Sequence, residues 1–307
     1  MGGWSGERGG EVGDDGGAGA SSGGRGTSGP GRVARARVAS GWANQLWRLG
    51  EDLAVRLPVL DDESAGLLAK EFRWLPELAP RLPLAVPVPL RFTSPSARFP
   101  RPWSVVEWVP GTPADTTPLT APADSAAALS AFLRALNRPA PPGAPTNPSR
   151  RAPLSARSDD VAAHLSRAAD KVDSAALQDI WSDAVSAPEW EALPVWLHGD
   201  LHPANVITNH GALTGVVDFG GMCAGDPAVD LSAAWKLLPH RVIPDFLATC
   251  PHADGATVRR ARGWALLSGL LMVSVGRAWT RGEPGGQPTW GAAGHRTLRR
   301  LRGLPDG

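Results

Sequence analysis

The segment that most constrains the fold of this 307-residue chain is LHGDLHPANVITNHGALTGVVDFG, residues 197–220. Its middle is typical of a β-hairpin, with β-prone residues at 206–208, a turn at 209–211 and a second apolar run at 213–217. Asp200 and Asn205 precede the first strand, and Asp218 ends the second. We therefore expect the hairpin to bring these three side chains together. Polar groups in an apolar neighbourhood need a partner or a function, so the segment predicts a site.

Two carboxylates and an amide oxygen in this arrangement suit phosphoryl transfer from a nucleotide. One carboxylate accepts or orients the attacking hydroxyl, and the other, with the Asn oxygen, holds Mg²⁺ on the phosphates. An unrelated chemistry remains open. His198, Asp200 and His202 form an H-x-D-x-H cluster, which Asp218 or Asp226 would complete as the metal site of a metallohydrolase. That alternative leaves Asn205 unexplained.

The pattern HGDxxxxN, followed by a hairpin and DFG, resembles the aminoglycoside phosphotransferase family, whose fold is similar to that of protein kinases. The resemblance spans roughly residues 40–280. It implies that Asp200 is catalytic and that Asn205 and Asp218 bind the metal. It also implies ATP or GTP with Mg²⁺ as cofactors, and a hydroxyl group of a small molecule, such as an antibiotic, sugar or related metabolite, as acceptor.

The order of predicted elements favours an α+β chain with two lobes. Strands at 32–40, 46–58, 84–92 and 102–109 surround one helix at 61–79. Helices follow at 125–136, 159–172, 175–187, 228–238 and 257–279. We predict a small β-rich N-lobe over residues 32–110, which binds the nucleotide, and a larger mainly helical C-lobe over 111–307, which carries the catalytic loop and acceptor site. The Gly-rich residues 1–31 are expected to be a disordered tail.

One carboxylate of the N-lobe lies on an apolar helix face. Glu71 shares its face with Leu67, Leu75 and Leu78, so it needs a cation. The resemblance provides Arg56, which would contact the nucleotide phosphates and pair with Glu71. Glu63 is the alternative partner.

Two further segments of the N-lobe are candidates for nucleotide contacts. The turn with Ser40, Gly41 and Asn44 would be the nucleotide loop, because glycine permits close backbone approach. Backbone groups near Glu107 and Val109 would bond the purine at the crossover between the lobes; the alternative is an ordinary edge strand.

Composition limits the partners. Charged residues make up 20% and the formal net charge is +1, so no global field favours nucleic acid or an anionic membrane. The two cysteines, Cys223 and Cys250, lack CxxC spacing, and a cytoplasmic location is the default. The apolar run Trp264–Val275 is too short to span a membrane and predicts a buried helix.

Several residues near the motif have structural interpretations. His198 and His202 are expected to be loop residues, Asp226 a helix cap, Asp230 a brace for the catalytic loop, and Cys223 a core residue. The Gly-rich tail runs almost directly into the first predicted strand, which is unusual for the family. A pseudokinase or nucleotide-binding interaction module is therefore a second hypothesis.

The charge pattern gives conflicting signals about the acceptor. Acids are frequent over residues 115–191, whereas arginines dominate beyond 255. Most of these charges are expected to lie on solvated helix faces. We therefore predict an acceptor that need not be cationic.

Overall fold

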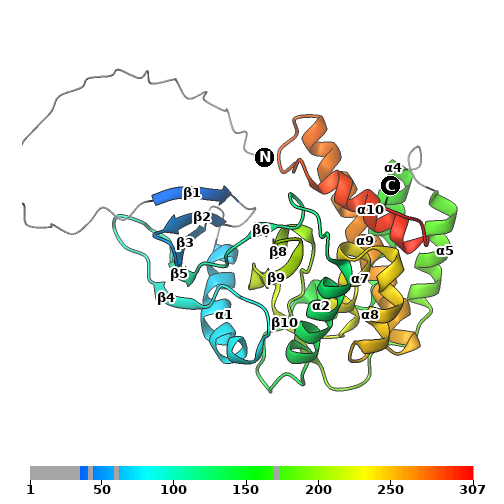
Figure 1. Cartoon of the computed structure of the whole chain (residues 1–307), viewed down its shortest axis with the longest axis horizontal. Helices are drawn as coiled ribbons and strands as arrows, with labels where there is room; N and C mark the ends of the chain where they lie inside the picture. Colours follow the sequence, from blue (N-terminus) through cyan, green and yellow to red (C-terminus); the bar gives the residue numbers. More distant parts are fainter. Residues whose placement is uncertain (1–34, 41–43, 59–61, 169–172, 307) are drawn as a thin grey trace, which may run out of the picture. The chain divides into compact units, whose positions relative to one another are not determined.

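The computed structural model describes residues 35–40, 44–58, 62–168 and 173–306 (Figure 1), so the predicted tail lies outside the described residues. The first part of the chain forms a five-stranded antiparallel sheet in the order β1-β2-β3-β5-β4. Its strands are β1 (Arg35–Ser40), β2 (Asn44–Leu49), β3 (Leu53–Pro58), β4 (Pro89–Thr93) and β5 (Trp103–Glu107). A turn at Gly50, with φ 69°, divides the predicted strand at 46–58 into β2 and β3.

Helix α1 (Asp62–Leu78) packs against this sheet through its apolar face. Leu75 and Leu78 are buried together with Glu71, and Leu67 is half-buried, so the predicted face is confirmed. The rings of Phe72 and Phe92 lie 5.7 Å apart and join α1 to β4. The helix thus carries its one buried carboxylate towards the sheet.

The predicted strand at 84–92 is only partly correct. Regular pairing begins at Pro89, and the earlier residues run beside the strand at 212–216 instead. Ala85 donates its N–H to Thr214 and accepts from Val216. Pro87 and Pro89 have no N–H to donate, which limits ladder pairing in this segment.

The remainder of the chain is mainly helical (Figure 1). The predicted helix at 228–238 is interrupted at Ser232. The Pro-rich connector, residues 139–153, contains a short helix that the sequence did not predict. Two later helices, α8 and α10, were also not predicted. The helices are α2 (Pro122–Leu136), α3 (Pro148–Arg151), α4 (Ser158–Ala168), α5 (Ser174–Val185), α6 (Ala228–Leu231), α7 (Ala233–Leu237), α8 (Ile243–Thr249), α9 (Gly255–Thr280) and α10 (Trp290–Leu301).

Helix α9 lies at the centre of the helical packing and contacts α4, α5, α6, α7 and α10. Trp264 and most of the apolar residues up to Val275 are buried, as predicted. The approach to α10 is close because two glycines face each other: a Cβ on Gly276 would lie 2.3 Å from the Cα of Gly291. Among the described residues, none of the helices combines the length and the apolar character needed to cross a membrane.

Two small sheets lie within the helical part. One pairs β7 (Val195–Leu197) with β10 (Cys223–Gly225), and the other has the order β6-β8-β9, with β6 at Thr112–Pro113. Strands β8 (Val206–Asn209) and β9 (Ala212–Val216) form the predicted hairpin. His210 at φ 49° and Gly211 at φ 78° make its turn. Short 3-10 helices occur at η1 (Ala79–Arg81), η2 (Leu154–Arg157), η3 (Pro203–Asn205), η4 (Phe219–Gly221) and η5 (His240–Val242).

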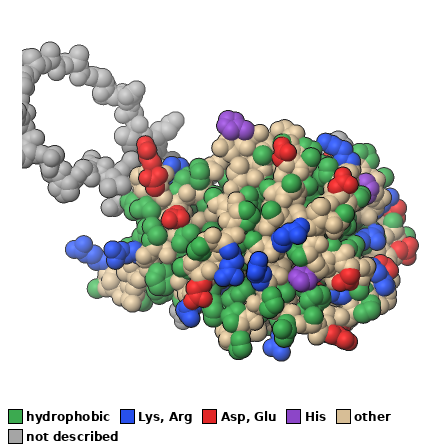
Figure 2. Space-filling model, turned by 60° about the horizontal axis from the view of Figure 1, so that its bottom comes forward, with side chains coloured by type: hydrophobic (Ala, Val, Ile, Leu, Met, Phe, Trp, Pro, Cys, Tyr) green, Lys and Arg blue, Asp and Glu red, His purple; other side chains and the backbone are tan. Residues whose placement is uncertain are grey.

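The acidic and basic runs of the sequence partly neutralise each other. Arg259 of α9 pairs with Asp183 of α5 at 2.9 Å, and Arg302 pairs with Asp173 at 2.8 Å. Side chains of both signs are interspersed on the face drawn in Figure 2. Pairs on these helices therefore stabilise packing at the surface and do not by themselves mark an acceptor site.

Candidate active site

The loop that follows β7 is held by a buried carboxylate. Asp230 accepts the backbone N–H of His198 at 2.7 Å through Oδ2 and that of Gly199 at 2.9 Å through Oδ1. Its side chain is fully buried on α6. This is the bracing contact that the sequence predicted for Asp230.

His198 also serves the loop. Its Nδ1 accepts the N–H of Asp200 at 3.2 Å, so the proton lies on Nε2, which donates to the carbonyl of Val217 at 3.0 Å. Burial lowers the pKa of His198 and favours the neutral ring, although Asp230 and Asp200 oppose the shift. Both ring nitrogens are therefore committed to the backbone, in agreement with the predicted structural role.

Gly199 allows the loop to approach the segment after Asp218. Its φ is +81°, and a Cβ there would lie 2.5 Å from the carbonyl oxygen of Gly221. A side chain is excluded by both the left-handed conformation and the contact. The HGD motif thus needs its glycine for geometry.

Asp200 projects from this loop with 46% of its side chain exposed. The Asn205 amide donates to its backbone oxygen at 3.0 Å and to Oδ2 at 3.4 Å. Arg150 lies 3.6 Å from Oδ1, and His202 Nε2 lies 3.5 Å from Oδ2. Partial burial alone would raise the pKa of Asp200, but His202, Arg150 and Lys236 outweigh it and hold the pKa well below its usual value. The carboxylate is therefore an ionised hydrogen-bond acceptor at neutral pH.

Asp218 meets the cation from the N-terminal sheet. It adopts a left-handed conformation, with φ 62°, directly before η4. Its Oδ1 accepts from Arg56 Nη2 at 3.1 Å, and 53% of its side chain is exposed. Arg56 also forms an ion pair with Glu71, and both of these side chains are buried. Strand β3, helix α1 and the DFG segment thus converge on one charged cluster.

The ion pair with Arg56 does not fully offset the effect of burial on the pKa of Glu71. Burial raises the pKa of the Glu71 carboxyl, Arg56 lowers it and Asp218 raises it, with a net increase. Oxygen Oε1 of Glu71 is buried without a hydrogen-bond partner among the described residues. Of the two acids considered for Arg56, the structure pairs it with Glu71, and the Glu63 side chain lies outside the described part.

Two glycines connect Asp200 with Asp218. A Cβ on Gly220 would lie 3.3 Å from Asp218 Oδ1, and one on Gly221 would lie 3.3 Å from Asp200 Cβ. Lys70 of α1 donates to the Gly220 carbonyl and fixes this segment against the helix. The two acids therefore lie on either side of the glycine pair, as the hairpin predicted.

The oxygen atoms of Asn205 and Asp218 suit Mg²⁺ better than the H-x-D-x-H cluster suits the metal site of a metallohydrolase. Asn205 uses its amide nitrogen on Asp200, which leaves its oxygen for a cation, and Asp218 has an exposed carboxylate. In contrast, the ring nitrogens of His198 are occupied by backbone groups. The part of the chain that is described holds no group of three or more His, Cys, Asp or Glu side chains placed to bind a metal.

The remaining predicted nucleotide residues are placed less completely. Glu107 donates its N–H to Val88 at 2.9 Å, so that amide is engaged in the sheet. No hydrogen bond among the described residues uses the backbone of Val109, which lies two residues beyond the end of β5. Ser40 is the last residue of β1, and Asn44 is the first residue of β2. Their side chains and Gly41 lie outside the described residues.

Sequence reasoning missed three residues around Asp200, and it considered His202 only as a loop residue or a metal ligand. Arg150 comes from α3 in the Pro-rich connector, and His202 contacts Asp200 in addition to accepting the Ala204 N–H at 3.3 Å. Trp290 of α10 packs edge-on against His202, with ring centroids 4.9 Å apart. Lys236 of α7 is buried and close enough to Asp200 for their charges to interact. A lysine within the apolar run AAWKLL was the one usable sequence signal.

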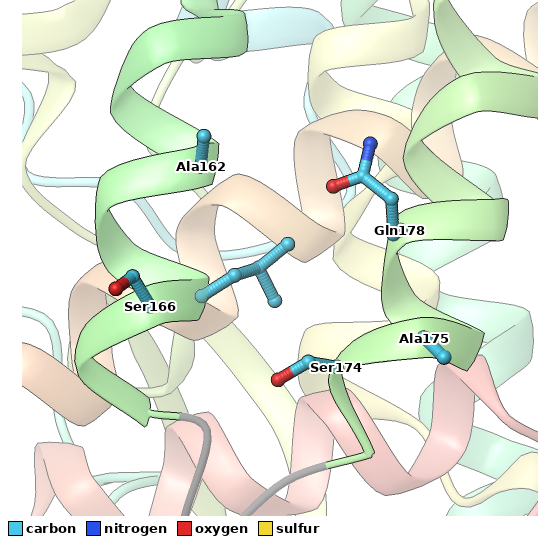
Figure 3. Close-up of a pocket in the computed structure, with 6 residues that line it drawn as sticks. Ala162, Ser166, Ser174, Ala175 and Gln178 are labelled. Atoms are coloured by element: carbon cyan, nitrogen blue, oxygen red, sulfur yellow. The ribbon is translucent and has the colours of Figure 1, made fainter.

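Two hollows of ≈ 370 Å³ lie away from these acids. The first, shown in Figure 3, lies between α4 and α5, where Ser166, Ser174 and Gln178 are its polar lining residues. The second lies beside the crossover and is lined by Glu107 and Trp108 together with residues after α1. Neither hollow is lined by Asp200, Asn205 or Asp218. The candidate site is therefore identified by its charged groups and not by one of these hollows.

Asp226, the first acid after the DFG segment, is not free for a ligand. Its Oδ1 accepts the N–H of Ala228, the first residue of α6, at 2.9 Å, although the N-cap position itself is held by Pro227 and not by Asp226 as predicted. Arg260 of α9 donates to both of its oxygens, at 2.7 and 3.2 Å. Cys223 is also buried, as predicted for a core residue.

Comparison with known proteins identifies the architecture. The model of the "Phosphotransferase enzyme family" matches residues 35–270. A search of curated proteins found no match. Among solved structures, the GDP complex of wild-type aminoglycoside 2'-phosphotransferase-IIIa is 18% identical, with a TM-score of 0.60, and the match covers 88% of this chain and 92% of that one. The macrolide 2'-phosphotransferase MphH from Brachybacterium faecium is 22% identical, with a TM-score of 0.54 and coverage of 85% and 91%.

These similarities confirm the expected α+β fold, with a small sheet followed by a mainly helical part. The family match covers the buried Arg56 and Glu71, the HGDxxxxN loop and the DFG segment. The chain therefore belongs to the phosphotransferase enzyme family.

Proposed function

We propose that the protein transfers the γ-phosphoryl group of ATP or GTP to a hydroxyl group of a small molecule, with Mg²⁺. The observation that carries the proposal is the arrangement of two adjoining clusters: Arg56 pairs with Glu71 and reaches Asp218, while Asn205 bonds to Asp200. The neighbouring antibiotic phosphotransferases, which include GDP complexes, support a nucleotide as donor.

The proposed roles follow from the chemistry of each group. Arg56 would hold nucleotide phosphates, and Asn205 and Asp218 would hold the metal ion, which neutralises charge on those phosphates when bound. Asp200 would accept a hydrogen bond from the acceptor hydroxyl and align its oxygen for attack. Its low pKa keeps it ionised for this purpose.

The proposal assigns a separate binding role to each of the two predicted lobes. Residues 32–110 would bind the nucleotide, with the backbone of Val109 and the segment at Glu107 beside the purine and the Ser40, Gly41 and Asn44 turn above the phosphates. The unused amide of Val109 supports a purine contact at that residue. Residues 111–307 would hold the acceptor.

The test is the isosteric substitution Asp200→Asn, with Asp179→Asn on the exposed face of α5 as the matched control. Loss of the carboxylate should lower transfer by about 10²–10⁴-fold, the usual contribution of such a group. Thermal shift with ATP or GTP and Mg²⁺ should be retained, because ligand binding to the native state raises its stability. Near-normal turnover in Asp200→Asn, with any accepted hydroxyl compound, would reject the role of Asp200.

A further inference from the structure

Two cations flank Asp200 on the side of the helical part. Arg150 lies 3.6 Å from Asp200 Oδ1, with its guanidinium over the ring of Trp264 at 5.5 Å and 25% of its side chain exposed. Lys236 comes from the neighbouring α7, and its charge interacts with both Asp200 and Arg150. Two positive charges therefore gather beside one catalytic carboxylate.

No residue in the described part of the chain accepts a hydrogen bond from the Lys236 ammonium group. Its residue is only 5% exposed, yet it makes no hydrogen bond or ion pair with the residues that the structure describes. A nitrogen without a hydrogen-bond partner could also be completely shielded from solvent, but the Lys236 nitrogen is not. The ammonium group therefore reaches solvent at its tip. A buried stem with an accessible, unpartnered charge suits the binding of an anion.

The nearby acids offset part of this positive charge, since Asp200 and Asp230 raise the pKa of Lys236, but most of their oxygens already accept other hydrogen bonds. Both oxygens of Asp230 accept N–H groups from the catalytic loop, and both oxygens of Asp226 accept from Arg260. Asp115 gives one oxygen to the Thr289 hydroxyl at 2.6 Å, and its other oxygen is shielded from solvent. Asp200 must face the acceptor hydroxyl. Among the groups beside Asp200, Arg150 and Lys236 therefore remain as hydrogen-bond donors for the rest of the acceptor.

We infer that Arg150 and Lys236 form a binding subsite for an oxyanion of the acceptor, so that the favoured substrates are hydroxylated small molecules that carry a carboxylate or a phosphate group. This inference rests on the proposed function, because it takes Asp200 as the group that faces the acceptor hydroxyl. A polycation would bring its ammonium groups against Arg150 and Lys236, which repel it.

Acceptor pairs that differ in one anionic group provide the test. Glucuronate is compared with glucose, ribose 5-phosphate with ribose, and kanamycin is included as a polycation. Transfer from ATP with Mg²⁺ is measured by mass spectrometry, and binding to the protein without nucleotide is measured by ligand-observed NMR. We expect the anionic member of at least one pair to bind and react at least about tenfold better than its neutral counterpart, as for one hydrogen bond to a charged group. The carboxylate and phosphate arms identify which oxyanion is preferred.

The variants Lys236→Met and Arg150→Met should each remove this preference by raising KM for the anionic acceptor, while KM for ATP stays unchanged. Lys236→Arg should restore much of it, which a merely structural role would not. Arg241→Met is the control, because Arg241 is exposed and its side chain forms no hydrogen bond or ion pair with another described residue. Thermal unfolding shows whether each variant is folded, and the two methionine variants test the subsite independently.

The inference is overturned if neutral or polycationic compounds bind and react as well as the anionic ones, or if the preference survives in both methionine variants. Absence of NMR binding by every anionic probe, in protein that still binds ATP with Mg²⁺, also overturns it. Failure of the proposed function looks different: ATP with Mg²⁺ would produce no thermal shift and no transfer, while anion binding that depends on Lys236 would persist.

Discussion

Arg56 is expected to be functionally essential although its ion pair contributes little net stability. The substitution Arg56→Met keeps most of the aliphatic packing but leaves Glu71 buried, at 2% exposure, without its cation. Asp218 is 53% exposed and becomes hydrated instead. The cost of the substitution therefore arises mainly from Glu71.

The magnitude follows from protonation of that carboxyl. Without Arg56, burial raises the pKa of Glu71 further, so the folded variant can hold Glu71 neutral while the unfolded chain ionises. The unfolded chain titrates near pH 4.3, so the upper limit of the cost is about 1 kcal/mol at pH 5 and about 4 kcal/mol at pH 7. The loss relative to the parent is below this limit, because Glu71 already has a raised pKa there. Stability is thus retained below about pH 4 and falls as the pH rises.

The double variant Arg56→Met with Glu71→Met distinguishes the stability contributed by the ion pair from the cost of leaving one buried charge unpaired. Replacing both buried charges with apolar groups is often neutral or stabilising. We expect the double variant to be as stable as the parent at pH 7, and phosphoryl transfer to be lost. Equilibrium unfolding in urea at pH 5 and pH 7, with mass spectrometry of the product, measures both properties.

Two results would refute this reasoning. One is a double variant whose destabilisation at pH 7 equals the sum of the two single variants. The other is an Arg56→Met variant whose destabilisation does not increase between pH 5 and pH 7.

Three further predictions concern the loop and the acceptor side. Gly199→Ala should destabilise the protein by more than about 1 kcal/mol in urea unfolding and lower turnover, because its φ is +81° and a Cβ would meet the Gly221 carbonyl; unchanged stability would contradict the contact. Asp226→Ala should cost about 3–5 kcal/mol in the same assay, since it strips a buried Arg260 of its carboxylate; a loss below about 1 kcal/mol would show that the remaining bonds suffice. Burial lowers the pKa of Lys236 to about 8, with Arg150 adding to the shift and Asp200 and Asp230 opposing it, so KM for an anionic acceptor should rise above pH 8 in the parent. Steady-state kinetics should show no such rise in Lys236→Arg, whose side chain stays charged.

Much of the site was predictable because its residues are close in sequence. The hairpin connects the loop with Asp200 and Asn205 to Asp218, and its turn and alternation are local signals. Glu71 was found for a similar reason: helical periodicity placed a carboxylate on an apolar face, and such a group needs a cation. Helix interruption at Ser232 and the late start of β4 were not predicted, because packing and pairing with distant residues decide where these elements begin and end.

The sequence alone therefore determined the order of the elements, the local geometry of the phosphoryl-transfer motif and the need of Glu71 for a cation. Only the tertiary structure decided which charges surround Asp200. Arg150, Lys236 and Trp290 come from α3, α7 and α10, and no sequence spacing relates them to the motif. The same holds for the acidic and basic runs, whose meaning changed once Arg259 and Arg302 were found paired with Asp183 and Asp173. Coulomb interactions depend on distance and burial in space, and those are properties of the packed helices.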